Sequence, residues 1–142
     1  MFRSLTDMMV VSPQIDLEGV KAARDAGITL IINNRPEDEE AGQVTGPAIE
    51  AAALALGLSY IAIPVTHSGF SQPQVKAMAD ALDAAVGPVL AYCRSGTRSC
   101  LLWSLAEASQ GAEPDDLTEI ASGAGYDVTP IRPLLDMLKA QA

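Results

Sequence analysis

A cysteine stands in a short polar loop between an apolar segment and a helix-like segment. The loop, Tyr92–Ser99, reads YCRSGTRS and places two arginines and a glycine within five residues of Cys93. A free cysteine has a pKa of about 8.5, and a position just before a helix lowers it, because unpaired backbone N–H groups favour negative charge. Gly96 lets the backbone turn its amides inward, and arginines stabilise a thiolate or bind an anion. The pattern predicts a nucleophile, Cys93, in an anion cradle.

Phosphoryl transfer and sulfur transfer both use such a cradle, and the spacing of the loop separates them. In tyrosine and dual-specificity phosphatases, the arginine that binds the phosphoryl oxygens is the sixth residue after the cysteine. In this chain the sixth residue is Ser99, and Arg98 is the fifth. The loop resembles instead that of the single-domain rhodaneses, which are sulfurtransferases. A shorter cradle suits a single sulfur atom better than a tetrahedral phosphoryl group.

The loop that would supply a general acid also favours sulfur chemistry. Cleavage of a phosphate monoester with a poor leaving group needs a proton donor. The segment IPVTHSGF carries no carboxylate, and His67 is its nearest titratable group. Sulfite and thiolates leave readily without a proton. His67 is expected to act as an acid or base toward an incoming thiol; the alternative is a loop histidine that only caps or packs.

The loop residues and one further arginine form the predicted site. The predicted catalytic residues are Cys93, Arg98 and His67, and the predicted substrate-binding residues are Arg94, Ser95, Gly96, Thr97, Ser99 and Arg35. The site is predicted to need no metal and no cofactor.

Other polar residues have simpler interpretations. Arg35 could reach the cradle as a third cation, or it could be a surface arginine paired with the acidic run Glu37–Glu40, which is typical of a solvated face. Asn34 is expected to hold its loop by an Asx turn. Cys100 is expected to pack within its helix rather than to approach Cys93 as a resolving cysteine.

Alternating strand-like and helix-like segments must position these residues. Strands are expected at residues 8–11, 28–33, 59–65 and 88–92, and helices at about 16–27, 47–57, 72–86, 98–109, 113–125 and from 129 to the C-terminus. This alternation predicts an α/β fold with a largely parallel sheet. Ligands bind beyond the carboxyl ends of such strands. The loops Asn34–Glu40, Thr66–Phe70 and Arg94–Arg98 are therefore expected to share one site.

Length and charge narrow the class of protein. A chain of 142 residues favours a single domain, 1–142, with a core of its own. The formal net charge of −9 argues against a nucleic-acid partner or an anionic membrane surface. No apolar run is long enough for a membrane span or a signal peptide, so a cytoplasmic protein is expected. One histidine and two cysteines are too few for a typical structural zinc site.

Three segments together resemble one bacterial family. INNRPEDEE, IPVTHSG and CRSGTRS are similar to the phosphatase-like domain of the beta-lactamase-hydrolase-like proteins, over roughly residues 3–110. The resemblance implies a fold similar to the dual-specificity and tyrosine phosphatases, with a mostly parallel four- to five-stranded sheet flanked by helices. It also implies a role in sulfide or persulfide handling. A separate persulfide dioxygenase is an implied partner, because family members occur alone or fused to one.

The predicted function is sulfur transfer. Cys93 would take a sulfane sulfur from thiosulfate or a persulfide, become a cysteine persulfide, and pass the sulfur to a thiol acceptor. The partners are then a small anionic sulfur donor and a thiol. Two alternatives stay open. One is a phosphatase-like hydrolase that acts through a phosphocysteine at Cys93, and the other is a non-catalytic persulfide or redox sensor modified at Cys93 without turnover.

Overall fold

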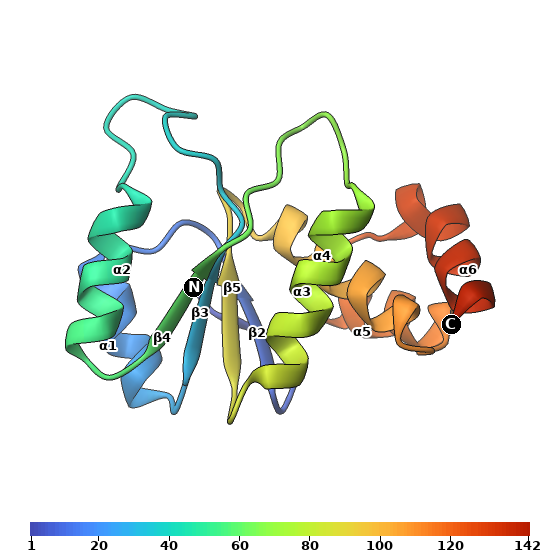
Figure 1. The fold of residues 1–142 in the computed structure, drawn as a ribbon, viewed down its shortest axis with the longest axis horizontal. Helices are drawn as coiled ribbons and strands as arrows, with labels where there is room; N and C mark the ends of the chain where they lie inside the picture. The colour runs from blue at the N-terminus through green and yellow to red at the C-terminus, as the bar shows by residue number, and fades with distance from the viewer.

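A computed structural model describes all residues, 1–142, and its centre is a five-stranded sheet (Figure 1). The strands are β1 (Arg3–Thr6), β2 (Met9–Ser12), β3 (Leu30–Asn33), β4 (Ser59–Ala62) and β5 (Val89–Tyr92), in the spatial order β1-β2-β5-β3-β4. The last four in that order run parallel, and β1 is antiparallel to β2. The carboxyl ends of the four parallel strands therefore lie at one end of the sheet.

The four strands expected from the sequence are confirmed; β2 is shifted by one residue from its expected bounds, and the other three are shorter than expected. The central strands β3 and β5 are buried along their whole length, as their continuous apolar sequences indicate. The hairpin strand β1 was not expected. Its residues are mostly exposed and polar at the edge of the sheet, so they carry neither an apolar run nor a clear alternation.

The helices are α1 (Leu17–Asp25), α2 (Gly46–Ala55), α3 (Gln72–Ala84), α4 (Thr97–Ser109), α5 (Pro114–Gly123) and α6 (Arg132–Gln141). Asp16 caps α1, and Ser71 and Gln74 form a capping box at α3. The last helix begins later than expected, because Thr129–Ile131 form a 3₁₀ turn before α6. None of the helices combines the length and apolar character needed to span a membrane.

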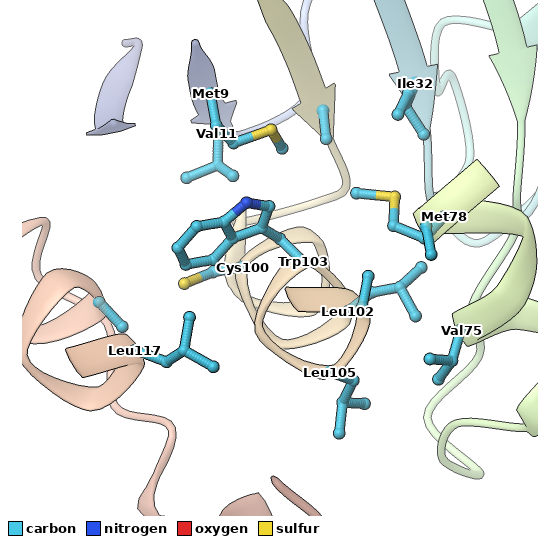
Figure 2. Packing of buried hydrophobic residues seen from close by; sticks show 14 of the residues in the cluster. Met9, Val11, Ile32, Val75, Met78, Cys100, Leu102, Trp103, Leu105 and Leu117 are labelled. Atoms are coloured by element: carbon cyan, nitrogen blue, oxygen red, sulfur yellow. The ribbon is translucent and has the colours of Figure 1, made fainter. Parts of the chain in front are cut away.

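The helices form two layers, one on each side of the sheet (Figure 1). Helices α1 and α2 cover one face, over a core that includes Ile31, Ile49 and Tyr92. Helices α3, α4 and α5 cover the other face, with α4 at the centre, and α6 packs on α4 and α5 on the side away from the sheet (Figures 1 and 2). Because α4 has α3, α5, α6 and the sheet around it, most of its residues are buried, including Arg98 and Ser99 in its first turn.

Candidate active site

Cys93 follows β5 directly and lies fully buried at the base of the loop that leads into α4. Its Sγ accepts a hydrogen bond from the backbone N–H of Gly96 at 3.1 Å. An N–H directed at the sulfur stabilises negative charge there. Gly96 is the N-cap of α4 with a φ of 92°, and a Cβ at this position would overlap the hydroxyl of Tyr126. The turn that brings the amide to the sulfur therefore requires glycine.

Arg98 is held firmly by the protein and keeps one edge of its guanidinium free. Nη1 donates to Glu39 Oε2 at 2.7 Å and to the Val65 carbonyl at 2.6 Å, and Nη2 donates to Glu39 Oε1 at 2.9 Å. Nε and the second Nη2 hydrogen donate to no protein oxygen, so this pair of donors is left to the Cys93 sulfur or to a ligand. Such a pair matches two oxygens of an oxyanion. The hydrogen bonds to Glu39 raise the pKa of Arg98, burial opposes the rise, and the nearby Cys93 adds to it.

Glu39 binds two arginines at once. Besides the two bonds from Arg98, its Oε1 accepts one from Arg35 Nε at 3.0 Å, and its side chain is only 15% exposed. The hydrogen bond from Arg98 is the largest cause that lowers the pKa of Glu39 to about 2; burial acts the other way, and Arg35 lowers it further. The interpretation of the acidic run as a solvated face is therefore wrong for Glu39.

Arg35 is buried, not a surface residue. Its side chain is 2% exposed, Nη1 donates to Gln14 Oε1 at 3.1 Å, and Nη2 lies 3.6 Å from Glu40 Oε1. The expected pairing with the acidic run is present, but the surface position is wrong. Arg35 forms no direct hydrogen bond with the Cys93 loop. It is linked to the loop through the glutamates and through Gln14, whose backbone N–H donates to the Arg94 carbonyl at 3.2 Å. Its role in substrate binding stays a prediction.

Arg94 lies at the exposed rim of the loop. Its Nη2 donates to Glu40 Oε2 at 3.0 Å, and both side chains are at least half exposed. An ion pair of this kind contributes little and exchanges readily with water or another anion. Together, three arginines and two glutamates leave one positive charge beside Cys93. This local charge is opposite to that of the whole chain.

Asn34 joins the loops behind the cradle. Its Oδ1 accepts from Ser99 Oγ at 2.8 Å, and its Nδ2 donates to the carbonyl of Ile63 at 2.9 Å. The Asx turn expected of Asn34 belongs instead to Asn33, whose Oδ1 accepts from the backbone N–H of Arg35. Ser99 is thus a buried structural contact as well as a loop residue.

Two of the three loops expected to share a site meet through their own residues, as in the bond from Arg98 to Glu39, whereas the expected second loop, Thr66–Phe70, forms no hydrogen bond with either. The segment that leads into it reaches the cradle instead, through the carbonyls of Ile63 and Val65. His67 lies further along it on an exposed segment and forms no hydrogen bond, so its acid–base role stays a prediction. Ser95 and Thr97 are exposed on the loop, where Ser95 Oγ donates to Thr97 Oγ1 at 3.1 Å.

Cys100 lies in the hydrophobic core beside Trp103 (Figure 2). It is fully buried, and burial raises the pKa of its thiol to about 12, with the nearby Cys93 adding to the rise and Ser104 opposing it. A thiol in this position stays protonated and has no path to solvent. The expected packing role fits these surroundings better than a resolving role.

The comparisons with known proteins identify the family of the chain. The family model for the phosphatase-like domain of beta-lactamase hydrolase-like proteins matches residues 1–110. The chain belongs to this family. A beta-lactamase hydrolase-like protein of Agrobacterium fabrum is 35% identical over 103 residues, which are 72% of this chain. The chain covers about a quarter (24%) of that relative's length.

Solved structures confirm the predicted fold. A candidate phosphatase of Neisseria meningitidis superposes with a TM-score of 0.84 at 31% identity, covering 96% of each chain. The structure named Tk-PTP, in its active form, has a TM-score of 0.76 at 16% identity and covers 99% of this chain. The fold is thus that of the tyrosine and dual-specificity phosphatases, as the resemblance implied. These likenesses support the phosphatase alternative better than the predicted sulfurtransferase.

Sequence reasoning missed the contact of Glu39 with Arg98, and it missed Tyr126. The one available signal for Glu39 was its position four residues after Arg35, a spacing that allows pairing in a tight turn. Tyr126 lies 31 residues beyond Ser95, whose carbonyl its hydroxyl contacts at 3.4 Å, and no local pattern indicates that approach.

Proposed function

We propose that this domain is a phosphatase-like hydrolase in which Cys93 takes a phosphoryl group from a monoester. The family match and the Neisseria structure support the phosphatase scaffold. The observation that carries the proposal is the closeness of Cys93, at the base of the loop, to the Arg98 guanidinium, whose Nε donates to no protein oxygen. A nucleophile beside a two-donor fork is what attack on a tetrahedral oxyanion requires.

The proposed reaction has two steps. The Cys93 thiolate attacks phosphorus, the bond from phosphorus to the leaving oxygen breaks, and the leaving group departs with the electron pair. Water then attacks the phosphocysteine and releases inorganic phosphate and the thiolate. Arg98 and the amides of Arg94–Arg98 would hold the phosphoryl oxygens in both steps.

The surroundings of the loop restrict the leaving group. The segment Ile63–Phe70 contains no carboxylate, and both Glu39 oxygens are occupied by arginines. A leaving group that departs without a proton is therefore favoured, such as the phenolate of an aryl phosphate. Alkyl phosphates, whose alkoxides need protonation, are expected to be poor substrates.

Sulfur transfer is a second candidate, and the spacing of the loop favours it. Arg98 is the fifth residue after Cys93, and the sixth position holds Ser99, which bonds to Asn34. In this reaction the thiolate attacks the sulfane sulfur of thiosulfate, and sulfite leaves with the electron pair. An acceptor thiolate then removes the outer sulfur of the Cys93 persulfide. No proton donor, oxidant or cofactor is needed.

Intact-protein mass spectrometry separates the two candidates. The purified protein is exposed in parallel to an aryl phosphate and to thiosulfate, rapidly quenched, and digested to identify the modified residue. The proposal expects a phosphoryl group on Cys93 and steady release of phosphate from the aryl ester. Cys93→Ser should lose both, whereas Cys100→Ala should retain them.

A sulfur atom on Cys93, removed by a thiol with turnover and without any phosphoryl adduct, would overturn the phosphatase proposal in favour of sulfur transfer. Sulfur on Cys93 that no thiol removes would instead identify a sensor domain. A protein that gains neither group, with Cys93 reduced, would exclude both enzyme functions.

A further inference from the structure

A second site candidate lies at the end of the sheet opposite Cys93. A cavity of about 390 Å³ opens between the β1–β2 turn, the start of β5, and helices α3, α4 and α5. Its walls are mostly apolar, and Figure 2 shows the indole of Trp103 with Met9 on one side and Leu117 on the other. The volume lies at the lower end of the range for small-molecule sites, about 300–1,000 Å³.

Glu107 provides a carboxylate within this apolar wall. It lies on α4, one turn beyond Trp103, and lines the cavity. Burial raises the pKa of Glu107, Asp83 raises it further, and Trp103 opposes the rise. Unlike Glu113 on the same rim, which pairs with Lys139 at 3.2 Å, Glu107 has no cationic partner. Its hydrogen bond with Trp103 is to a neutral group, so the charge of this partly buried carboxylate is unbalanced, and a bound cation would lower its free energy.

The other residues that line the cavity indicate the charge of its ligand. Glu113 and Asp116 add negative charge, and no lysine, arginine or histidine lines the cavity. An anionic ligand is therefore repelled, and the chain's net charge of −9 attracts cations from solution. The face of an indole also favours a positive charge.

We propose that this cavity binds a small organic cation, an ammonium group carried on an apolar body. Glu107 receives the ammonium, and Trp103, Met9 and Leu117 pack against the body. The site is separate from the Cys93 loop but shares α4 with it, since Arg98 stands in the first turn of the helix and Glu107 in its last part. The proposal does not depend on which group Cys93 transfers.

Three probes that share a phenyl group on a three-carbon chain and differ in charge test the proposal. They are 3-phenylpropylammonium, the neutral 3-phenylpropanol and the anionic 3-phenylpropanoate. Trp103 is the only tryptophan in the chain, so its emission reports binding directly, and calorimetry gives the affinities. The dissociation constant of the cation should be about 10 mM or lower. It should bind about tenfold or more tightly than the alcohol, because a charge-assisted hydrogen bond replaces a neutral one. The anion should bind most weakly.

The variant Glu107→Gln should bring the cation and the alcohol to equal affinity. Glu119→Gln, which removes the same charge from an exposed position on α5 outside the cavity, should leave the tenfold preference unchanged. Equal affinity of the cation and alcohol for the unmodified protein would overturn the proposal, and so would no binding of any probe. That comparison needs no variant to fold. A preference that persists in Glu107→Gln would also overturn the role of this carboxylate.

Discussion

Each end of the sheet holds a partly buried glutamate, and the surroundings of the two carboxylates are opposite. Glu39, at the carboxyl end, accepts three hydrogen bonds from Arg35 and Arg98. Glu107, at the amino end, lies against an apolar wall with Asp83 as its charged neighbour. The pKa of Glu39 is lowered to about 2, and that of Glu107 is raised.

The difference shows how glutamate side chains at two positions serve two purposes. Glu39 satisfies two buried cations and fixes one edge of Arg98 while leaving the other edge free for a ligand. Glu107 has the neutral Trp103 as a hydrogen-bond partner but no cation, so it can gain from a cationic ligand. A carboxylate already paired within the protein indicates a positioning role, and an unpaired one in a cavity indicates a binding role.

Replacing the guanidinium of Arg98 should have the largest effect of the substitutions at the carboxyl end of the sheet. Arg98→Lys keeps the charge but loses the pair of donors that faces the ligand and the two bonds to Glu39. We expect the rate of Cys93 modification to fall by roughly 10²- to 10³-fold, measured in single turnover with an aryl phosphate or with thiosulfate. Arg24→Lys, at an exposed ion pair, should leave the rate unchanged. Full activity of Arg98→Lys would contradict the assigned role.

Neutralising Glu39 should destabilise the protein. Glu39→Gln leaves Arg35 and Arg98 buried without their shared charge partner, a change that costs about 2–3 kcal/mol at a nearly buried site. Urea unfolding at neutral pH measures the loss. Glu18→Gln, whose partner Lys21 is exposed, should change stability by less than about 1 kcal/mol. Equal losses of unfolding free energy in the two variants would show that Glu39 contributes no more to stability than the control glutamate.

The low pKa of Glu39 also predicts a pH window. The folded state binds fewer protons at this group than the unfolded state, so its contribution to stability is complete above pH 4.5 and disappears as the pH falls to about 2. The gap in unfolding free energy between the wild type and Glu39→Gln should narrow steadily across that window. A gap that is constant between pH 4.5 and 2 would show that the pairing is not ionic.

Neutralising Glu107 should have the smallest effect, with the opposite sign. Because burial and Asp83 disfavour its charged form, Glu107→Gln should stabilise the free protein by about 0.5 kcal/mol. Differential scanning calorimetry without ligand detects this change, with Glu119→Gln as the matched control. Destabilisation by Glu107→Gln would mean that the carboxylate has a partner in solution, and the contrast between the two ends would then disappear.

Local sequence patterns predicted most of the fold. Polar caps such as Asp16 and Ser71, and apolar strands such as Leu30–Asn33, act through neighbours in the chain, so their structure can be inferred from the chain alone. The edge strand β1 could not be inferred, because its mostly exposed and polar residues form neither an apolar run nor a clear alternation.

The candidate site was predicted less completely. The loop from Cys93 to Arg98 is contiguous, and its chemistry follows from its composition. The contacts of Glu39 with Arg98, and of Asn34 with Ser99, join residues 59 and 65 positions apart. Only the arrangement of the strands brings these residues together, so an acidic run that includes Glu39 had the appearance of a solvated surface.

Arg3 in β1 links the first residues of the chain to the last third. Its Nη1 donates to the carbonyl of Ala124 at 2.9 Å, and its guanidinium lies 5.3 Å from the ring centroid of Tyr126, which in turn touches the Cys93 loop. Contacts between such distant parts of the chain cannot form until the intervening segments have collapsed. The family match ends at residue 110, but this structure does not divide there. Amide-exchange protection of β1, α5 and the loop should therefore rise and fall together, as one cooperative unit.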